Sequence, residues 1–455
     1  MEFTAWSLFI DIGLVSALLL IGTILRAKVK VIQKLFLPAG IIAGILGLIL
    51  GPNGFGLIPF SQQIGVYPGI LIAVIFGALP LTAQKVPWKE ISRRVGGMWS
   101  FSQFVMICMW GGGLLFSLLI INTIWKDEVH LGFGLMLAAG FAGGHGTAAA
   151  IGDAFAQHGW EDATSLAMTS ATVGIVSAIV IGMIFVKRGA SKGQTSFLTS
   201  FDRLPDELKT GLVPSKNRKA IKMDTVSSIS IDPLIFHASI VGLIAMLGYF
   251  LSKWGAELLP KVALPAFSLA FIVGLIVKKA LDKMQADDYV DKDVINRISG
   301  AATDLLVAFG ISSISLPVVL EYITPLAILF LFGLLYAWVC CLSLSKRFFS
   351  EYWFEKGLFT WGWATGTVAM GIALLRIVDP DLKSKTLDDF GLAYIPMAPV
   401  EIAVVTFSPL LIATGQHWLF VAVTLAFGII LIALARMNKW IVPVGTNNKD
   451  TNINL

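Results

Sequence analysis

Long apolar stretches separated by short polar loops make up most of this chain of 455 residues. A helix needs about 20 apolar residues to cross the hydrocarbon core of a bilayer. The composition agrees with such spans, since 56% of the residues are hydrophobic and only 14% are charged. We therefore expect an all-α polytopic membrane protein. The pattern predicts membrane-spanning helices near residues 6–25, 35–50, 67–83, 98–121, 165–186, 234–252, 262–278, 300–320, 324–345, 391–414 and 417–436.

Two further apolar segments, 131–157 and 357–377, are interrupted by glycine. The first contains the run AGGHGTAAAIG, which begins at Ala142. Glycine loosens a helix and bares its backbone, and lipid offers no partner for exposed peptide groups. Such a break is tolerated where protein or a water-filled cavity surrounds it. We interpret the break as a solute site; the alternative is a close helix–helix contact between small residues.

Basic residues are concentrated in alternate loops, and the positive-inside rule converts this pattern into a topology. Loop 51–66 carries no charged residue, and 153–162 is acidic without lysine or arginine. We therefore expect the N-terminus outside, with the C-terminus and the basic loops in the cytoplasm. This topology requires that 131–157 dips in from outside and returns, the alternative being a fully spanning broken helix. Segment 357–377 is expected to dip from the cytoplasmic side. The basic loops are 26–34, 84–97, 187–222, 278–299 and 346–356.

Two stretches far apart in the chain share a pattern. Residues 37–49 read LPAGIIAGILGLI and residues 264–276 read LPAFSLAFIVGLI, with a common Leu-Pro-Ala opening and an aligned glycine. With the charge pattern, this predicts two inverted-topology repeats of about five spans each, an arrangement typical of secondary transporters with a site at the repeat interface. The expected organisation is a first repeat at 1–188, a cytoplasmic linker at 189–232, a second repeat at 233–414, and an additional C-terminal span and tail at 415–455.

The residues at the two breaks are suited to binding an anion. A helix that begins at each break presents free N–H groups and the positive end of its dipole. His145 and Thr147 add hydrogen-bonding side chains, although His145 could instead tie the loop to a neighbouring group or relay a proton. The candidate substrate-binding residues are Gly143, Gly144, His145, Gly146 and Thr147 at the first break and Thr365, Gly366 and Thr367 at the second.

A few polar groups within apolar runs are candidates for a cation. Asp304, Ser312 and Ser313 share one predicted span, and Glu401 lies in another. Carboxylate and hydroxyl oxygens in a dry setting suit sodium, although serine in a membrane helix often bonds its own backbone. We expect sodium as the coupling ion and no other cofactor. Likewise, the spacing Gly40-x-x-x-Gly44 predicts close helix packing, within one protomer or in a dimer.

The first break carries a resemblance to a known family. Its Gly-Gly-His-Gly-Thr-Ala-Ala run, in a re-entrant position, is similar to the signature of the bacterial sodium/glutamate symporter family. The resemblance implies sodium-coupled symport of glutamate or a related small carboxylate by alternating access. It also implies a homodimer in the bacterial cytoplasmic membrane. At the second break, WGWATGT stands where the well-known glutamate carriers have a glycine-histidine-cysteine-glycine type of run. This departure leaves open another organic anion or coupling to protons.

Other classes of protein fit the sequence less well. The net charge of +5 is spread over short loops, so no nucleic-acid partner is expected. No Ser/His/Asp or metal-ligand cluster gathers on neighbouring segments, which argues against an enzyme. A passive channel is a weaker alternative to a carrier, because two opposed broken segments are typical of carriers.

Overall fold

The computed structural model describes residues 4–83, 88–197, 210–214, 225–227, 229–258, 264–380 and 382–441, and this part of the chain contains no β-strand. Within the described residues every predicted span overlaps a helix, so the all-α polytopic fold is confirmed. Among the described residues, eight helices are long and apolar enough to cross a membrane. They cover Ala5–Lys28 (α1), Val95–Ile124 (most of α5 and its extension), Ala163–Ser191 (α9), Pro233–Leu258 (α11), Lys292–Ser312 (α13), Ile323–Phe348 (α15 and its extension), Thr386–Ala413 (α19) and His417–Met437 (α20).

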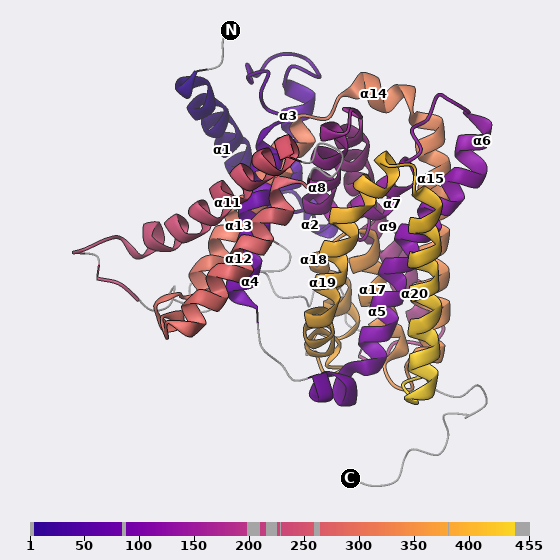
Figure 1. Ribbon diagram of the computed structural model, residues 1–455. Helices are drawn as coiled ribbons and strands as arrows, with labels where there is room; N and C mark the ends of the chain where they lie inside the picture. Colours follow the sequence, from indigo (N-terminus) through magenta and orange to yellow (C-terminus); the bar gives the residue numbers. More distant parts are fainter. Residues whose placement is uncertain are drawn as a thin grey trace.

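One predicted boundary is wrong. The span expected at 300–320 ends at Ser312, and Leu316–Glu321 forms a separate short helix, α14. Proline lacks an N–H group and is favoured in the first turn of a helix, so Pro317 starts α14 instead of continuing α13. Figure 1 shows α14 at the top of the molecule, beyond the end of α13.

Six helices form the group drawn on the left of Figure 1: α1, α3 (Ala39–Leu50), α4 (Tyr67–Thr82), α11, α12 (Ala266–Lys283) and α13. Gly40 and Gly44 of α3 pack inside this group. A β-carbon at Gly40 would lie 3.6 Å from Val307, and one at Gly44 would lie 2.6 Å from Ile311, both on α13. Gly40 and Gly44 therefore serve helix packing within the protomer, and not packing between the two protomers of a dimer.

The remaining long helices, α5 (Trp88–Phe116), α9, α15 (Ile323–Trp338), α19 and α20, stand on the right of Figure 1 around two pairs of shorter helices. Helix α5 packs against α19 and α20. Gly428 on α20 leaves room for Cys108, and Gly111 on α5 leaves room for Thr424. The two groups meet where α4 and α13 contact α8 (Gly144–Gln157).

The predicted division into repeats stays a prediction. Helix α9 continues into the expected linker 189–232 as far as Ser191, and most of that linker (198–209, 215–224 and 228) lies outside the described residues. The additional span is present as α20, and the tail from residue 442 onward is also outside them. The start of α1 and the end of α20 lie at opposite ends of the molecule (Figure 1).

Candidate solute site at two opposed hairpins

The first broken segment is a hairpin of two short helices, α7 (Leu135–Gly140) and α8. The His130 ring, before α7, stacks on Trp160, after α8, with 4.1 Å between the ring centroids. A β-carbon at Gly132 would lie 2.7 Å from the Phe155 ring. Both ends of the segment are therefore at the same place. The segment thus folds back on itself, which is the path expected if 131–157 dips in and returns.

The turn of this hairpin requires glycine. Gly144 has φ +64°, the left-handed region that side-chain-bearing residues rarely adopt. Gly143 leaves the space that the Thr147 side chain fills. Helix α8 then begins without a side-chain cap at Gly143.

The second broken segment is also a hairpin, formed by α17 (Trp353–Thr365) and α18 (Val368–Val378). Its two helices touch through glycines. A β-carbon at Gly362 would lie 2.7 Å from the Gly371 backbone, and one at Gly371 would lie 2.7 Å from the Phe359 carbonyl oxygen. Helix α18 begins at an extended Thr367, again without a side-chain cap.

The hairpins enter from opposite ends of α9. The first packs at the start of α9, where Gly152 leaves room for Thr164. The base of the second packs at its other end, where Gly189 leaves room for the Phe354 ring. This is the opposed arrangement that the charge pattern predicts.

The two tips touch. A β-carbon at Gly144 would lie 3.2 Å from Thr367 Cγ2 and 3.4 Å from the Gly366 carbonyl oxygen. The two glycine breaks, more than 200 residues apart in the sequence, thus form one crossing, and α8 and α18 both begin there. The structure brings together the two sets of substrate-binding residues predicted from the sequence.

The surface of α9 on which both hairpins pack was not predicted from the sequence. Helix α9 contacts both hairpins: Gly140 of α7 packs on Ser170, Gly174 leaves room for the Thr365 carbonyl, and Trp361 Nε1 donates to the Ala178 carbonyl oxygen (3.0 Å). Small residues at every fourth position are a sequence signal for such packing. In α9 this signal comprises Ser170, Gly174, Ala178 and Gly182.

His145 is tied to α9. Its Nε2 lies 3.1 Å from Thr172 Oγ1, and that hydroxyl donates its own proton to the Met168 carbonyl oxygen at 2.9 Å. The His145 Nε2 is therefore the donor and carries a proton. Of the three predicted roles for His145, this contact corresponds to the local tie.

Of the four residues predicted for sodium, Asp304, Ser312 and Ser313 lie on α13 or at its end, and Glu401 lies on α19. Asp304 is exposed, and Ser312 follows it by eight residues on α13, about 12 Å along the axis. Ser312 donates to the Ala308 carbonyl (2.7 Å), and Ser313 donates to the Gly310 carbonyl (3.0 Å), the backbone bonding expected of serine in helices. Glu401 is on α19 and accepts from the Tyr394 hydroxyl (3.0 Å). Within the described part of the chain, no cluster of three or more His, Cys, Asp or Glu residues could hold a metal ion.

A family model described as sodium/glutamate symporter matches residues 7–347. The chain belongs to the sodium/glutamate symporter family. This family consists of transporters and not of enzymes, and the chain is a multi-pass membrane protein. The matched range of this symporter-family chain contains the whole first hairpin and ends before α17, so the second hairpin lies beyond it.

Two other comparisons add little to the family assignment. No curated protein sequence is significantly similar to this chain. Among solved structures, the sodium proton antiporter MjNhaP1 from Methanocaldococcus jannaschii, determined at pH 8, is 18% identical, with 95% of this chain and 98% of that chain covered and a TM-score of 0.38.

Proposed function

We propose that this symporter-family chain carries glutamate or a related small carboxylate together with sodium, by alternating access, across the bacterial cytoplasmic membrane. The crossing of the two hairpin tips is the observation that carries the proposal. Two helices, α8 and α18, begin at that contact, and neither start is capped by a side chain. Their first-turn N–H groups and dipoles favour negative charge at one place.

The same crossing offers oxygen atoms to sodium. The Gly366 carbonyl faces Gly144, and Thr367, the next residue in the chain, carries a hydroxyl group. Backbone carbonyls at unwound helix segments coordinate sodium in other secondary transporters. We propose that sodium binds these oxygens, next to the solute carboxylate, and that no other cofactor takes part.

Alternating access requires the crossing to face each side in turn. Both hairpins pack on α9, so we propose that they move together with it. The contacts of α8 with α4 and α13 would then slide against the other helix group. The orientation of the termini and the homodimer implied by the family resemblance remain part of this proposal.

The test is uptake of labelled L-glutamate into proteoliposomes under an inward sodium gradient. We expect uptake that falls to background when potassium replaces sodium. Uptake that ignores the sodium gradient but follows a pH gradient would replace sodium by protons as the coupling ion. Saturable counterflow, in which internal unlabelled glutamate accelerates entry of labelled glutamate, is expected of a carrier and not of a channel. No glutamate uptake in any gradient would contradict the proposed substrate, and thermal-shift screening of other carboxylates would then follow.

A further inference from the structure

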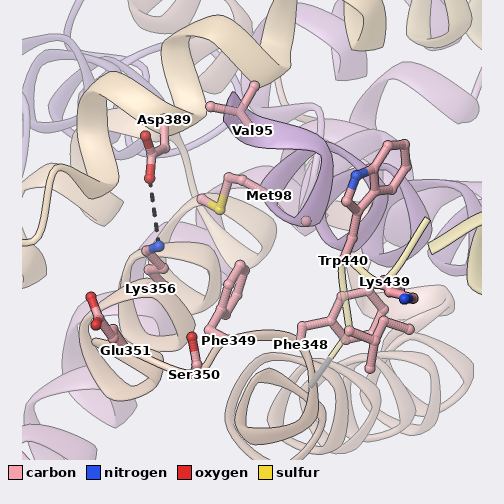
Figure 2. A pocket seen from close by; sticks show the side chains of 12 residues that line it. Val95, Met98, Phe348, Phe349, Ser350, Glu351, Lys356, Asp389, Lys439 and Trp440 are labelled. Carbon is pink, nitrogen blue, oxygen red and sulfur yellow. Dashed lines mark ion pairs between the residues drawn. The ribbon is translucent and has the colours of Figure 1, made fainter. Parts of the chain in front are cut away.

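A cavity of about 380 Å³ lies at the foot of the second hairpin (Figure 2). This volume falls within the range of about 300–1,000 Å³ typical of small-molecule sites. The cavity is lined by the start of α17, the start of α19 and the lower part of α5. It is also lined by the loop 348–351 and by residues 439–441, which follow α20. Basic helix ends gather at this end of the molecule, which the positive-inside rule places in the cytoplasm.

One ion pair reaches across this cavity. Lys356 Nζ lies 3.5 Å from Asp389 Oδ2, and the two side chains are only 16% and 18% exposed. Charge-assisted hydrogen bonds between nitrogen and oxygen are ordinarily about 2.7–2.9 Å long, so this pair is loose. Lys356 also lies over the Phe349 ring, 5.0 Å from its centroid. A second carboxylate that enters the cavity can therefore compete with Asp389 for the ammonium group.

An aromatic cluster separates this cavity from the crossing. Phe390 follows Asp389 on α19, and its ring centroid lies 4.9 Å from Phe359 and 5.1 Å from Trp363 of α17. All three rings are buried. Trp363 precedes Thr365 at the tip by two residues, so the cluster occupies the length of α17 between the cavity and the crossing.

We propose that the cavity is a second binding station for a carboxylate-bearing solute, on the inner side of the crossing. Lys356 exchanges its partner Asp389 for the solute carboxylate. The aromatic cluster of Phe359, Trp363 and Phe390 closes the passage to the crossing. This inference rests on the proposed anion transport and adds to it a separate inner site.

The test measures protection of the cavity from chemical labelling in purified protein. Ser350→Cys puts one thiol in the cavity wall, and the native cysteines Cys108, Cys340 and Cys341, all buried, are replaced by alanine. We expect L-glutamate to slow maleimide labelling of this thiol and glutaramide, which carries no carboxylate, to leave it unchanged. Lys356→Gln should weaken protection by about ten-fold, since a hydrogen bond to a charged group is lost. Asp389→Asn should strengthen it, because Lys356 loses its competitor.

Lys439→Gln is the matched control, since Lys439 lines the same cavity on the side of Trp440, away from the ion pair (Figure 2). Its protection should equal that of the parent. Equal loss of protection in Lys439→Gln and Lys356→Gln would overturn the assignment to Lys356, as would unchanged protection in Asp389→Asn. Sodium-driven uptake without any protection would overturn the inner station and leave the proposed function standing. Protection without uptake would overturn the proposed function and leave the inner binding station standing.

Discussion

The two hairpins place a glycine at the same crossing for different physical reasons. In the first, a six-residue α7 leads into a turn where Gly144 has φ +64°. In the second, the thirteen-residue helix α17 is followed by Gly366, whose φ is −135°. The first glycine is needed for its backbone conformation. The second is needed for space, since a β-carbon there would lie 3.0 Å from Ala178 and 3.1 Å from Met370.

This difference explains why the two breaks differ in how visible they are in the sequence. A left-handed turn admits little besides glycine, so the first break carries a dense glycine run that sequence reasoning can find. A crowded position depends on its neighbours, which are spread along other helices. The second motif is accordingly more diffuse, although it lies against the first.

The largest effect is expected at the first tip. Gly144→Val should abolish sodium-driven uptake while the protein remains in the membrane. A left-handed conformation costs a residue with a side chain about 1–2 kcal/mol, and the added group also meets Thr367 of the second tip. Uptake into proteoliposomes at matched protein content measures the loss.

Gly159→Ala is the matched control for this change. Gly159, in the loop after α8, has φ +89°, and no atom of the described residues lies within 4 Å of the place that its β-carbon would take. It bears a similar conformational cost away from the crossing. Equal loss of uptake in both variants would reduce the effect at Gly144 to a general loss of stability.

An intermediate effect is expected at the second tip, and it should be reversible. Gly366→Ala should lower uptake through crowding against Ala178, at a cost of about 1–3 kcal/mol for an overpacked position. Adding Ala178→Gly should restore uptake, because it removes the opposing methyl group. Unrestored uptake in the double variant Gly366→Ala with Ala178→Gly would contradict this difference between the hairpins. Restored uptake in Gly144→Ala on adding Thr367→Ser, which removes the methyl group near Gly144, would contradict it as well.

Hydropathy and charge predicted much of the fold. The spans follow from apolar length, and the re-entrant path of 131–157 follows from the acidic, cation-free stretch after it. The contact between the tips could not be read in this way, since it depends on how both hairpins pack on α9. The small-residue spacing from Ser170 to Gly182 was a usable sequence signal of this packing surface on α9.

The residues predicted to hold sodium stay a prediction. Asp304, Ser312 and Glu401 share a polar character in apolar runs, but sequence does not say which way each faces. In the structure the Ser312 hydroxyl lies 2.7 Å from the Ala308 carbonyl oxygen of its own helix and 3.3 Å from the Gly44 carbonyl oxygen of α3, and Asp304 is exposed. Composition identifies unusual residues, and only the fold decides which of them meet.

A smaller effect is expected from the tie between the first hairpin and α9. Thr172→Val removes the oxygen that accepts from His145 Nε2 and leaves that buried donor unpaired. The loss should be about 1–3 kcal/mol of hairpin stability, seen as a lower melting temperature and weaker uptake. Thr172→Ser keeps the hydroxyl and should behave as the parent. The second hairpin has no histidine, so any matching sensitivity there would have to come from another contact.

The smallest effect distinguishes the two hairpin bases by pH. Burial lowers the pKa of His130 below its ordinary value of 6.5, and its Nδ1 accepts the Gly132 N–H group at 3.0 Å, a bond that protonation would break. The folded chain therefore binds this proton less readily than the unfolded chain. The stabilising contribution is complete above pH 6.5 and is lost as pH falls through the window between 6.5 and the lowered pKa. Melting temperature should thus decline on acidification in the parent and decline less in His130→Gln. Lys356→Gln, at the base of the other hairpin, is the control variant and should keep the profile of the parent. An unchanged profile in His130→Gln would assign the acid sensitivity to other groups.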